Sequence, residues 1–177
     1  MTYLMTADEA VRLVRVFGKH GVDACVGGGW GVDALLGRQT RDHVDLDVWL
    51  PAGQFENAMV ALVSAGVDRI HPWPGDKPWN FVVHDGGRRR MDLHIYETRT
   101  DGMIHYGSAV AGESFPAAAL DGSGIIAGVT VRCEAPEWSV RWHTGYAPRD
   151  KDRHDVPLVC ARFGIALPAA YQTSPLR

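Results

Sequence analysis

The run VDLDVWL, from Val44 to Leu50, places Asp45, Asp47 and Trp49 on one side and Leu46, Val48 and Leu50 on the other. Apolar Leu46 and Val48 alternate with the acidic Asp45 and Asp47. A period of two predicts a strand with one buried face, so both carboxylates point away from the core on the same side. At about twice the strand rise, their Cα atoms lie about 7 Å apart, close enough to flank a divalent cation.

A glycine triplet, Gly27-Gly28-Gly29, precedes this strand and follows the strand-like DACV. Trp30 to Leu36 then has the length of a short helix that Gly37 can end. Glycine lets a ligand approach the backbone closely, and a helix start offers N–H groups to phosphate, which makes Gly28 and Gly29 candidate phosphate contacts. The pattern is neither the dinucleotide G-x-G-x-x-G nor a P-loop. The alternative is that the glycines only form a tight turn.

One helix is predicted before this region and one after it. Residues 6–21 carry a capping box, Thr6 with Glu9, an apolar stripe at helical spacing and a stop at Gly21. After Pro51 ends the acidic strand, QFENAMVALVSAG predicts a second helix. Its expected apolar stripe consists of Phe55, Met59, Leu62 and Val63.

The segment WNFVVHDGGRRRMDLHIYE predicts a hairpin with its turn at Asp85-Gly86-Gly87. In its second strand Asp92 and His94 share one face. If the hairpin joins the sheet of Asp45 and Asp47, three carboxylates converge, and their repulsion would require a cation. Magnesium prefers oxygen ligands and completes its shell with water and substrate phosphates. The alternative is that each aspartate caps a turn or faces water.

The rest of the chain is less regular. Residues 98–131 predict turns and short strands, and a helical region follows Asp150, either kinked at Pro157 or restarted with Asp155 as its cap. We expect 1–97 to form an α/β core, which 98–177 completes within one compact domain. Arg88 to Arg90 predict a solvated strand edge, and HTGY with RDKDRHD a surface loop and a capped helix. Four tryptophans are expected in the core or in a pocket wall: Trp73, Trp79, Trp138 and Trp142. Four acidic residues are expected at the surface: Glu113, Asp121, Glu134 and Glu137.

Composition excludes several classes of protein. The 177 residues carry a formal net charge of −3, which argues against a nucleic-acid partner. Cys25, Cys133 and Cys160 are far apart and odd in number, so we expect reduced thiols and no thiolate zinc site. No basic leader and no apolar run near the roughly 20 residues of a membrane span are present. We therefore expect a cytoplasmic protein without a membrane partner.

The stretch GGGWGVDALLGRQTRDHVDLDVWL closely resembles the signature of the lincosamide and aminoglycoside 2''-nucleotidyltransferases, within the DNA polymerase beta superfamily. VRCEAPEWSVRWHTGYAPRDKDRHDV is similar to their C-terminal segment, and residues 98–128 match poorly. The shared residues are Gly28, Gly29, Trp30, Asp33, Gly37, Thr40, Arg41, His43, Asp45 and Asp47. The resemblance implies a nucleotidyltransferase fold, a small mixed sheet flanked by helices, with a C-terminal extension of short strands and a helix.

The resemblance also implies site residues. Asp45 and Asp47 would hold Mg²⁺, as a pair of ions, against the triphosphate of a bound nucleoside triphosphate. Asp92 would be a further metal ligand or the base that deprotonates the acceptor, and these roles stay open. His94 and Glu97 are reserves for that base, although a strand histidine beside carboxylates is more often a hydrogen-bonded structural partner.

Four more residues complete the implied nucleotide site. Gly28 and Gly29 would face the phosphates, Arg41 would touch the triphosphate, and His43 would orient Asp45 or Asp47. Arg41 is alternatively an exposed turn residue.

The expected reaction is transfer of a nucleoside monophosphate from the triphosphate to a hydroxyl of a small molecule, an antibiotic being the candidate acceptor. We expect a monomer or a homodimer. One alternative is a metal-dependent phosphohydrolase, and another is a non-catalytic nucleotide-binding or interaction protein of the same fold. The hydrolase would hold two metals with Asp45, Asp47, Asp92, His43, His84 and His94.

Overall fold

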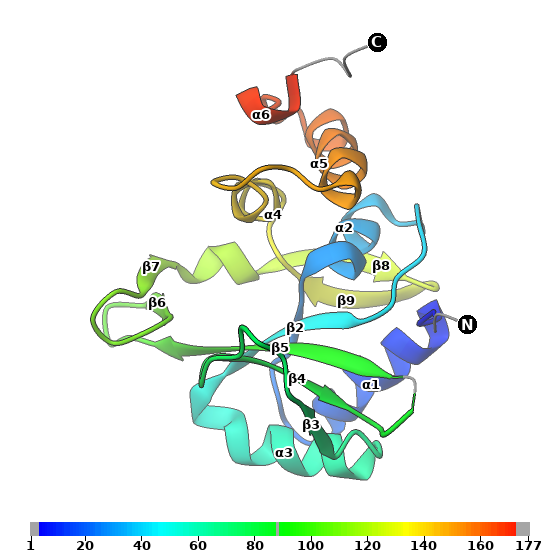
Figure 1. Cartoon of the computed structure of the whole chain (residues 1–177), viewed down its shortest axis with the longest axis vertical. Coiled ribbons are helices and arrows are strands. Elements are labelled where there is room, and N and C mark those ends of the chain that lie inside the picture. Colours follow the sequence, from blue (N-terminus) through cyan, green and yellow to red (C-terminus); the bar gives the residue numbers. More distant parts are fainter. Residues whose placement is uncertain (1–3, 88, 173–177) are drawn as a thin grey trace.

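The computed structural model describes residues 4–87 and 89–172, and within them the strands form one nine-stranded mixed sheet (Figure 1). Its main path runs β3-β4-β5-β2-β1-β9-β8, with β6 beside β5 and β7 beside β6. The strands are β1 (Cys25–Val26), β2 (Leu46–Pro51), β3 (Arg69–His71), β4 (Asn80–His84), β5 (Arg90–Thr98), β6 (Met103–Tyr106), β7 (Glu113–Pro116), β8 (Gly122–Ile126) and β9 (Val129–Cys133).

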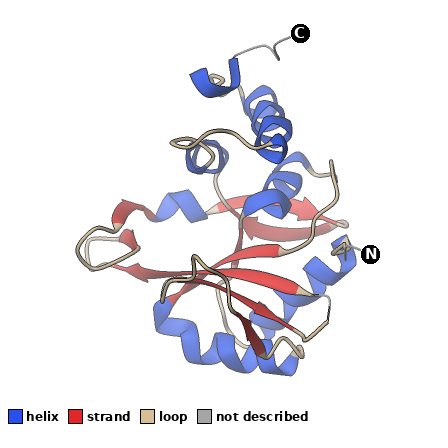
Figure 2. Cartoon of the chain, in the orientation of Figure 1, coloured by secondary structure: helices blue, strands red, loops and turns tan. Residues whose placement is uncertain are grey.

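Helices lie on both sides of this sheet (Figure 2). In the view shown, α1 and α3 pack against each other in the lower half of the molecule, whereas α2, α4 and α5 contact one another in the upper half. The mixed α/β class predicted from sequence is confirmed. The helices are α1 (Ala7–Lys19), α2 (Gly28–Leu36), α3 (Phe55–Ser64), α4 (Pro136–Trp142), α5 (Asp150–Phe163) and α6 (Ala169–Gln172), with 3₁₀ turns at Ala52–Gln54 and Ala117–Leu120.

The strand that carries Asp47 lies in the middle of the sheet. β2 pairs antiparallel with β1 and parallel with β5, and β5 pairs antiparallel with β4 in the predicted hairpin. Leu46, Val48 and Leu50 belong to the main apolar core, whereas Trp49 belongs to a second cluster with Tyr96 and Phe115. The alternation therefore separates core side chains from the opposite face, which keeps Asp47 available to the helices α2, α4 and α5.

Local signals placed two helices well. Thr6 and Glu9 form the predicted capping box: the Thr6 hydroxyl accepts from the Glu9 N–H at 3.3 Å, and the Glu9 carboxylate accepts from the Thr6 N–H at 3.0 Å. Gly37 ends α2 in the left-handed conformation, as predicted, with φ of 70°. The same helix begins at Gly28, two residues earlier than predicted, so the glycines are its first turn and not only a loop before it.

The predicted face of α3 is wrong in part. The side chain of Val63 is 63% exposed, and Phe55 is also exposed. The buried residues are Ala58, Ala61, Leu62 and Ala65, which follow the i, i+3, i+4, i+7 pattern of one helix face. Small alanines suit close packing of the helix, so Phe55 and Val63 lie beside the contact, whereas Leu62 lies within it as predicted.

Two further expectations are corrected. α5 runs through Pro157 without a break, so no new helix begins at Asp155, which is buried inside α5. Arg90 starts β5, which pairs on both sides and is not a sheet edge. Arg89 donates to the Asp85 carboxylate at 2.9 Å and to the Ala65 carbonyl at 3.2 Å, and Arg88 lies outside the described residues.

The three cysteines are buried and free, as expected. None of the helices in the described part of the chain has the length and apolar character needed to cross a bilayer.

Candidate active site

Asp47 on β2 and Asp92 on β5 are direct partners in the parallel register of these strands. His94 lies two residues further along β5, on the same face as Asp92. One ligand atom from each of the three lies within 4.8 Å of the others. The Nε2 atom of His94 is 3.8 Å from Asp47 Oδ1 and 4.0 Å from Asp92 Oδ1. Strand pairing therefore assembles a group of two carboxylates and one imidazole.

Neighbouring side chains fix the orientation of this group. Asn80 on β4 donates a hydrogen bond from its amide to Asp92 Oδ1. The Nδ1 atom of His94 lies 2.8 Å from the Tyr106 hydroxyl in a hydrogen bond, and the His94 ring stacks on Trp49 with ring centroids 4.7 Å apart. Each ionisable member on β5 thus has a partner that limits its rotamers.

The local charges shift the pKa values of all three groups. The pKa of Asp92 is raised to about 6, because burial and the charge of Asp47 outweigh the opposing effects of His94 and Asn80. Burial alone would raise the pKa of Asp47, but the nearby His94, with Nε2 3.8 Å from its carboxylate, brings it below its usual value. Burial would lower the pKa of His94, but Asp47 and Asp92 raise it. The carboxylates therefore favour a positive charge between them.

Asp45 does not belong to this group of three, although the sequence predicted that it would. It lies one residue before β2 begins, so it does not share the regular strand with Asp47. Burial raises its pKa, and so does the charge of Asp47, whereas Lys151 lowers it. Asp45 is therefore close enough to Asp47 to interact electrostatically and sits beside the cluster.

The glycines bring the start of α2 directly against Asp47. Gly28 has φ of 55°, and a Cβ atom there would overlap the Asp47 carboxylate. A Cβ atom on Gly29 would collide with the Arg41 guanidinium and the His43 ring. The first N–H groups of a helix have no partner within the helix and lie at its positive end. This geometry places an anion-binding helix end beside the carboxylates, where the resemblance implied that Gly28 and Gly29 would face phosphates.

A cavity of about 250 Å³ opens over Asp47 and His94. Gly28 and Gly29 form part of its wall, and its remaining side chains are of three kinds: cations and histidine, aromatic rings, and one further carboxylate. They are Arg41, Arg149, Lys151 and His143; Trp49, Trp142 and Tyr146; and Glu134. The combination of cations, flat rings and carboxylates suits a ligand with phosphates and a cyclic organic part.

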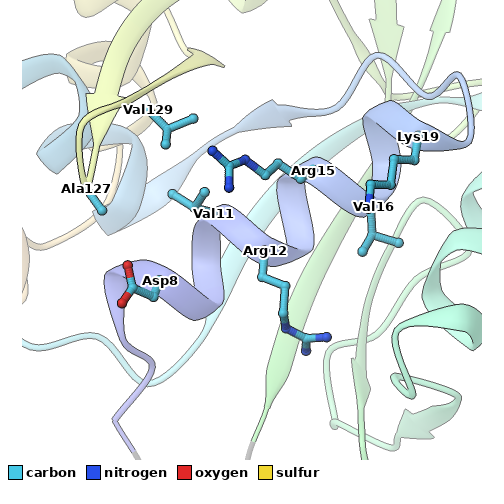
Figure 3. A pocket seen from close by; sticks show the side chains of 8 residues that line it. All are labelled: Asp8, Val11, Arg12, Arg15, Val16, Lys19, Ala127 and Val129. Carbon is cyan, nitrogen blue, oxygen red and sulfur yellow. The ribbon is translucent and has the colours of Figure 1, made fainter.

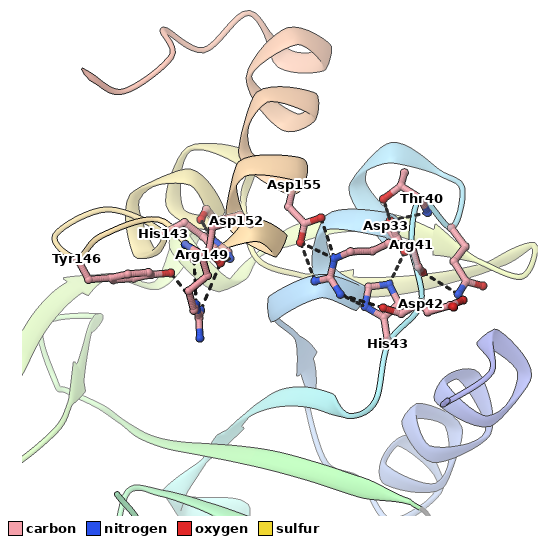
Figure 4. Close-up of polar contacts among 12 residues, drawn as sticks. Asp33, Thr40, Arg41, Asp42, His43, His143, Tyr146, Arg149, Asp152 and Asp155 are labelled. Atoms are coloured by element: carbon pink, nitrogen blue, oxygen red, sulfur yellow. Dashed lines mark hydrogen bonds and ion pairs between the residues drawn. The ribbon is translucent and has the colours of Figure 1, made fainter. Parts of the chain in front are cut away.

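Arg41 and His43 belong to one polar network (Figure 4). Arg41 donates from Nε and Nη2 to the Asp155 carboxylate at 2.7 to 3.1 Å, and its Nη1 lies 3.1 Å from His43 Nδ1. The other ring nitrogen of His43 bonds to Asp33, and the histidine is 3% exposed. The expectation that His43 orients Asp45 or Asp47 is therefore wrong: its ring partners are Asp33 and Arg41. Arg41 itself lines the cavity.

The segment from His143 to Asp155 does more than the predicted surface loop and capped helix. Arg149 donates to the buried Asp152 at 3.0 Å, and the Tyr171 hydroxyl donates to the His143 carbonyl (Figure 4 shows the contacts of Asp152). His143, Tyr146, Arg149 and Lys151 line the cavity. The capped helix is confirmed, with Asp152 at the third helical position. Residue types alone did not reveal that the preceding loop covers Asp47.

Glu134 was expected at the surface and is instead 4% exposed. Its Oε1 accepts a hydrogen bond from Trp49 Nε1 at 2.8 Å, and burial raises its pKa. Its Oε2 is buried and has no hydrogen-bond partner among the described residues. The sequence offered no signal for this, because Glu134 lies 85 positions from Trp49.

Several residues that the sequence suggested for the site do not meet the cluster. Glu97, the reserve base, is exposed on β5 opposite His105. His84 accepts a hydrogen bond from the Gly86 N–H, and Trp73 is 58% exposed. Among the described side chains the six ligands of the two-metal hydrolase are therefore not brought together.

A second hollow of about 500 Å³ lies where α1 faces the β8–β9 hairpin (Figure 3). Arg12, Arg15 and Lys19 line it with Asp8 and apolar side chains. It contains neither the glycine turn nor paired carboxylates. The cavity over Asp47 is therefore the candidate active site.

Comparison with known proteins agrees with this assignment. The model of the aminoglycoside-2''-adenylyltransferase family matches residues 10–158. A lincosamide resistance protein of Staphylococcus haemolyticus is 23% identical over 86% of this chain and 92% of its own length. A 2''-aminoglycoside nucleotidyltransferase of Klebsiella pneumoniae is 33% identical over 70% of this chain and 66% of its own length.

Two solved structures share the fold. The lincosamide antibiotic adenylyltransferase LnuA, solved with lincomycin bound, superposes with a TM-score of 0.77 over 90% of this chain and 99% of its own, at 22% identity. ANT(2'')-Ia, solved in complex with adenylyl-2''-tobramycin, gives 0.68 over 88% and 87%, also at 22% identity. The chain therefore has the nucleotidyltransferase fold and belongs to the aminoglycoside-2''-adenylyltransferase family of nucleotidyltransferases.

Proposed function

We propose that this protein transfers a nucleoside monophosphate from a nucleoside triphosphate to a hydroxyl of a small molecule, with Mg²⁺, and releases pyrophosphate. One observation carries the proposal: Asp47 and Asp92 are opposed on parallel strands, and the glycine start of α2 lies directly against Asp47. The carboxylates supply the metal ligands and the helix end supplies the phosphate contact that this reaction requires together.

The residues present fit magnesium. Asp47 and Asp92 offer hard oxygen ligands, with Asp45 beside them. The raised pKa of Asp92 reflects a cost that a divalent cation would offset. His94 is an imidazole, which Mg²⁺ does not favour, so we assign it to orienting Asp47 and not to binding the ion. When bound, Mg²⁺ would stabilise both the attacking and the departing oxygens of the displacement.

The remaining groups bind and orient the nucleotide. The α2 start, Arg41 and Lys151 would hold the triphosphate, since these cations line the cavity that contains Asp47. Arg149 adds a further positive charge at the same wall. Their combined charge would favour departure of pyrophosphate, which leaves with more negative charge than the bridging oxygen carries before cleavage.

In the transfer itself, the acceptor oxygen forms a bond to the α-phosphorus while the bond from that phosphorus to the pyrophosphate oxygen breaks. The acceptor proton needs a base. Asp92 has a pKa of about 6 and is therefore mostly ionised at neutral pH, and Asn80 orients its carboxylate. We propose that Asp92 serves either as this base or as a metal ligand.

The relatives suggest the acceptor class. One is named for lincosamide resistance and others for 2''-aminoglycoside nucleotidyl transfer. We therefore propose a lincosamide or aminoglycoside antibiotic as acceptor and antibiotic inactivation as the biological role. A cytoplasmic location and a monomeric or homodimeric state stay predictions.

The test is pyrophosphate release from ATP, GTP, CTP and UTP with Mg²⁺, measured with and without a panel of lincosamides and aminoglycosides. Asp47→Asn should abolish release. The matched control is Asp42→Asn, because Asp42 is exposed and lies outside the cluster.

Release that requires an acceptor, persists in Asp42→Asn and is lost in Asp47→Asn supports nucleotidyl transfer. Triphosphate consumption without any acceptor would instead favour the hydrolase. An active Asp47→Asn variant would rule out the metal site as assigned.

A further inference from the structure

The cavity contains an acidic side chain that the phosphate chemistry does not use. Glu134 follows β9, is 4% exposed and is held through Oε1 by the Trp49 indole. Its Oε2 is buried and receives no hydrogen bond from the described chain, and Glu134 is one of the residues that line the cavity. Buried acceptors are nearly always satisfied, so an unpaired carboxylate oxygen on a cavity-lining residue favours a hydrogen-bond donor on the ligand.

Trp142 provides the complementary observation. Its indole lines the same cavity, stacks on Trp49 with centroids 4.8 Å apart, and has a buried Nε1 that bonds to no described residue. Beside the same Trp49 ring there is thus one unpaired acceptor and one unpaired donor. A pair of neighbouring hydroxyls, which both donate and accept, matches these two atoms, whereas a phosphate only accepts.

The order of strands indicates which substrate carries these hydroxyls. Asp92 lies on β5, Asp47 on β2, and Glu134 follows β9, in the order β5-β2-β1-β9. Asp47 therefore separates Glu134 from Asp92, the candidate base for the acceptor. The α2 start, which would hold the phosphates, lies on the Glu134 side: a Cβ atom on Gly27 would touch Glu134 Oε1.

We infer that Glu134 and Trp142 form a ribose-binding subsite, in which Glu134 Oε2 accepts from a ribose hydroxyl of the nucleotide and Trp142 Nε1 donates to a hydroxyl oxygen of the same diol. The inference rests on the proposed nucleotidyl transfer and specifies how its donor is held. Glu134 then selects ribonucleotides, and the stacked rings of Trp49 and Trp142 lie where the nucleoside enters the cavity.

The test is calorimetric binding, with Mg²⁺, of four probes: ATP, 2'-deoxyATP, 3'-deoxyATP and inorganic triphosphate. Two variants are compared with the wild type. Glu134→Gln keeps an amide oxygen for Trp49 but removes the charged acceptor, and Trp142→Phe keeps the ring but removes the N–H. Glu137→Gln is the control, because Glu137 is exposed on α4 only three residues away.

We expect loss of one ribose hydroxyl to weaken wild-type binding about tenfold, the usual scale for a charged hydrogen bond. Glu134→Gln should weaken ATP binding to a similar extent and make ATP and that deoxy analogue bind alike. Trp142→Phe should also weaken ATP. Inorganic triphosphate should bind all variants equally, and Glu137→Gln should match the wild type.

Other outcomes separate the two proposals. If the wild type binds inorganic triphosphate but ATP and both deoxy analogues bind it equally, the ribose subsite is wrong and the transfer proposal stands. If Glu134→Gln raises the KM for the acceptor and leaves nucleotide affinity unchanged, the carboxylate serves the acceptor and the subsite is likewise wrong. If the wild type binds neither ATP nor triphosphate, the proposed function fails and the subsite fails with it.

Discussion

The raised pKa of Asp92 reflects its partly buried position beside a second carboxylate. Asp92 faces Asp47 across two paired strands, and its pKa lies well above that of an exposed aspartate. Burial is the main cause of this rise and the charge of Asp47 adds to it, and His94 offsets only part of the two effects, because the pKa remains at about 6. The sheet thus holds this carboxylate pair at a cost in stability that a bound cation would reduce.

This cost predicts a pH effect in metal-free protein. The pKa of Asp92 is about 6 in the folded chain against 3.8 for the free side chain, so the folded state binds more protons between these values. The free energy of unfolding should therefore fall as pH rises from about 4 to about 6. Asp92→Asn has no carboxyl group to titrate at this position. Between pH 4 and pH 6 its free energy of unfolding should therefore rise by about 1–2 kcal/mol relative to that of the wild type, after allowance for the partial exposure of Asp92.

The measurement is denaturant unfolding of both proteins in a chelator at several pH values. Equal differences between wild type and Asp92→Asn at pH 4 and pH 6 would show that Asp92 is not under this strain. Asp42→Asn, which removes an exposed carboxylate outside the cluster, is measured in parallel as the control.

Residue-scale features differ in how visible they are in sequence. Strand alternation and the hairpin predicted the face that Asp47 and Asp92 each occupy, but the pairing of β2 with β5, which brings them together, was only a condition of that prediction and is shown by the structure. His43, Glu134 and Asp155 could not be placed in this way. Their partners come from distant segments, as in the Arg41–Asp155 contact across 114 positions, and periodicity carries only local information.

At the scale of elements, the start of α2 is the part most closely tied to the chemistry. Gly28 and Gly37 lie at its two ends and both have positive φ, but only Gly28 has the Asp47 carboxylate where a Cβ atom would be. The two positions therefore separate backbone strain from intrusion into the site.

We predict that Gly28→Ala and Gly37→Ala each lower the free energy of unfolding by about 1–2 kcal/mol through left-handed strain. Only Gly28→Ala should also lower kcat/KM, by about a hundredfold, because it displaces Asp47. Steady-state kinetics and thermal unfolding of both variants check this. Similar kinetic losses in both would mean that strain, and not the contact with Asp47, is responsible.

A second element, α5, is attached to the site through one ion pair. The Asp155 side chain is almost fully buried and binds Arg41 with two donors, which joins α5 to the loop before β2. Asp155→Asn should therefore lower the free energy of unfolding by about 2 kcal/mol and weaken triphosphate binding, since Arg41 loses its anchor. Asp150→Asn, exposed at the start of α5, should change neither by a comparable amount. Urea unfolding and triphosphate titration of both variants check this. Equal stability and equal triphosphate affinity in the two variants would show that the Arg41–Asp155 ion pair does not support the site.

Elements with strong local signals were predicted, and those without were not. The capping box of α1, the Gly37 stop of α2 and the β4–β5 hairpin follow from residues within a few positions of each other. Of the two alternatives predicted at Pro157, the new helix capped by Asp155 is wrong, because α5 continues through the proline despite its missing N–H. For 98–131 only turns and short strands were expected, and β6 to β9 are paired with partners that its glycine- and alanine-rich sequence does not identify.

For the whole molecule, the parts come together around one cavity. The sheet supplies Asp47, with Asp92 paired to it, α2 supplies the glycine start proposed to contact phosphate, and the segment before α5 supplies cations and rings. The family match covers residues 10–158 and therefore includes all of these parts. The same fold occurs in solved structures named for a lincosamide and for an aminoglycoside product, so the proposed acceptor panel contains both classes.

The most direct measurement is the mass of the acceptor after incubation with nucleoside triphosphate and Mg²⁺, for the wild type, Asp47→Asn and Asp42→Asn. The account predicts that a lincosamide or an aminoglycoside gains one nucleoside monophosphate with the wild type and Asp42→Asn, and stays unmodified with Asp47→Asn. A triphosphate that is consumed while every acceptor keeps its mass, or an acceptor that Asp47→Asn modifies as fast as the wild type does, would contradict it.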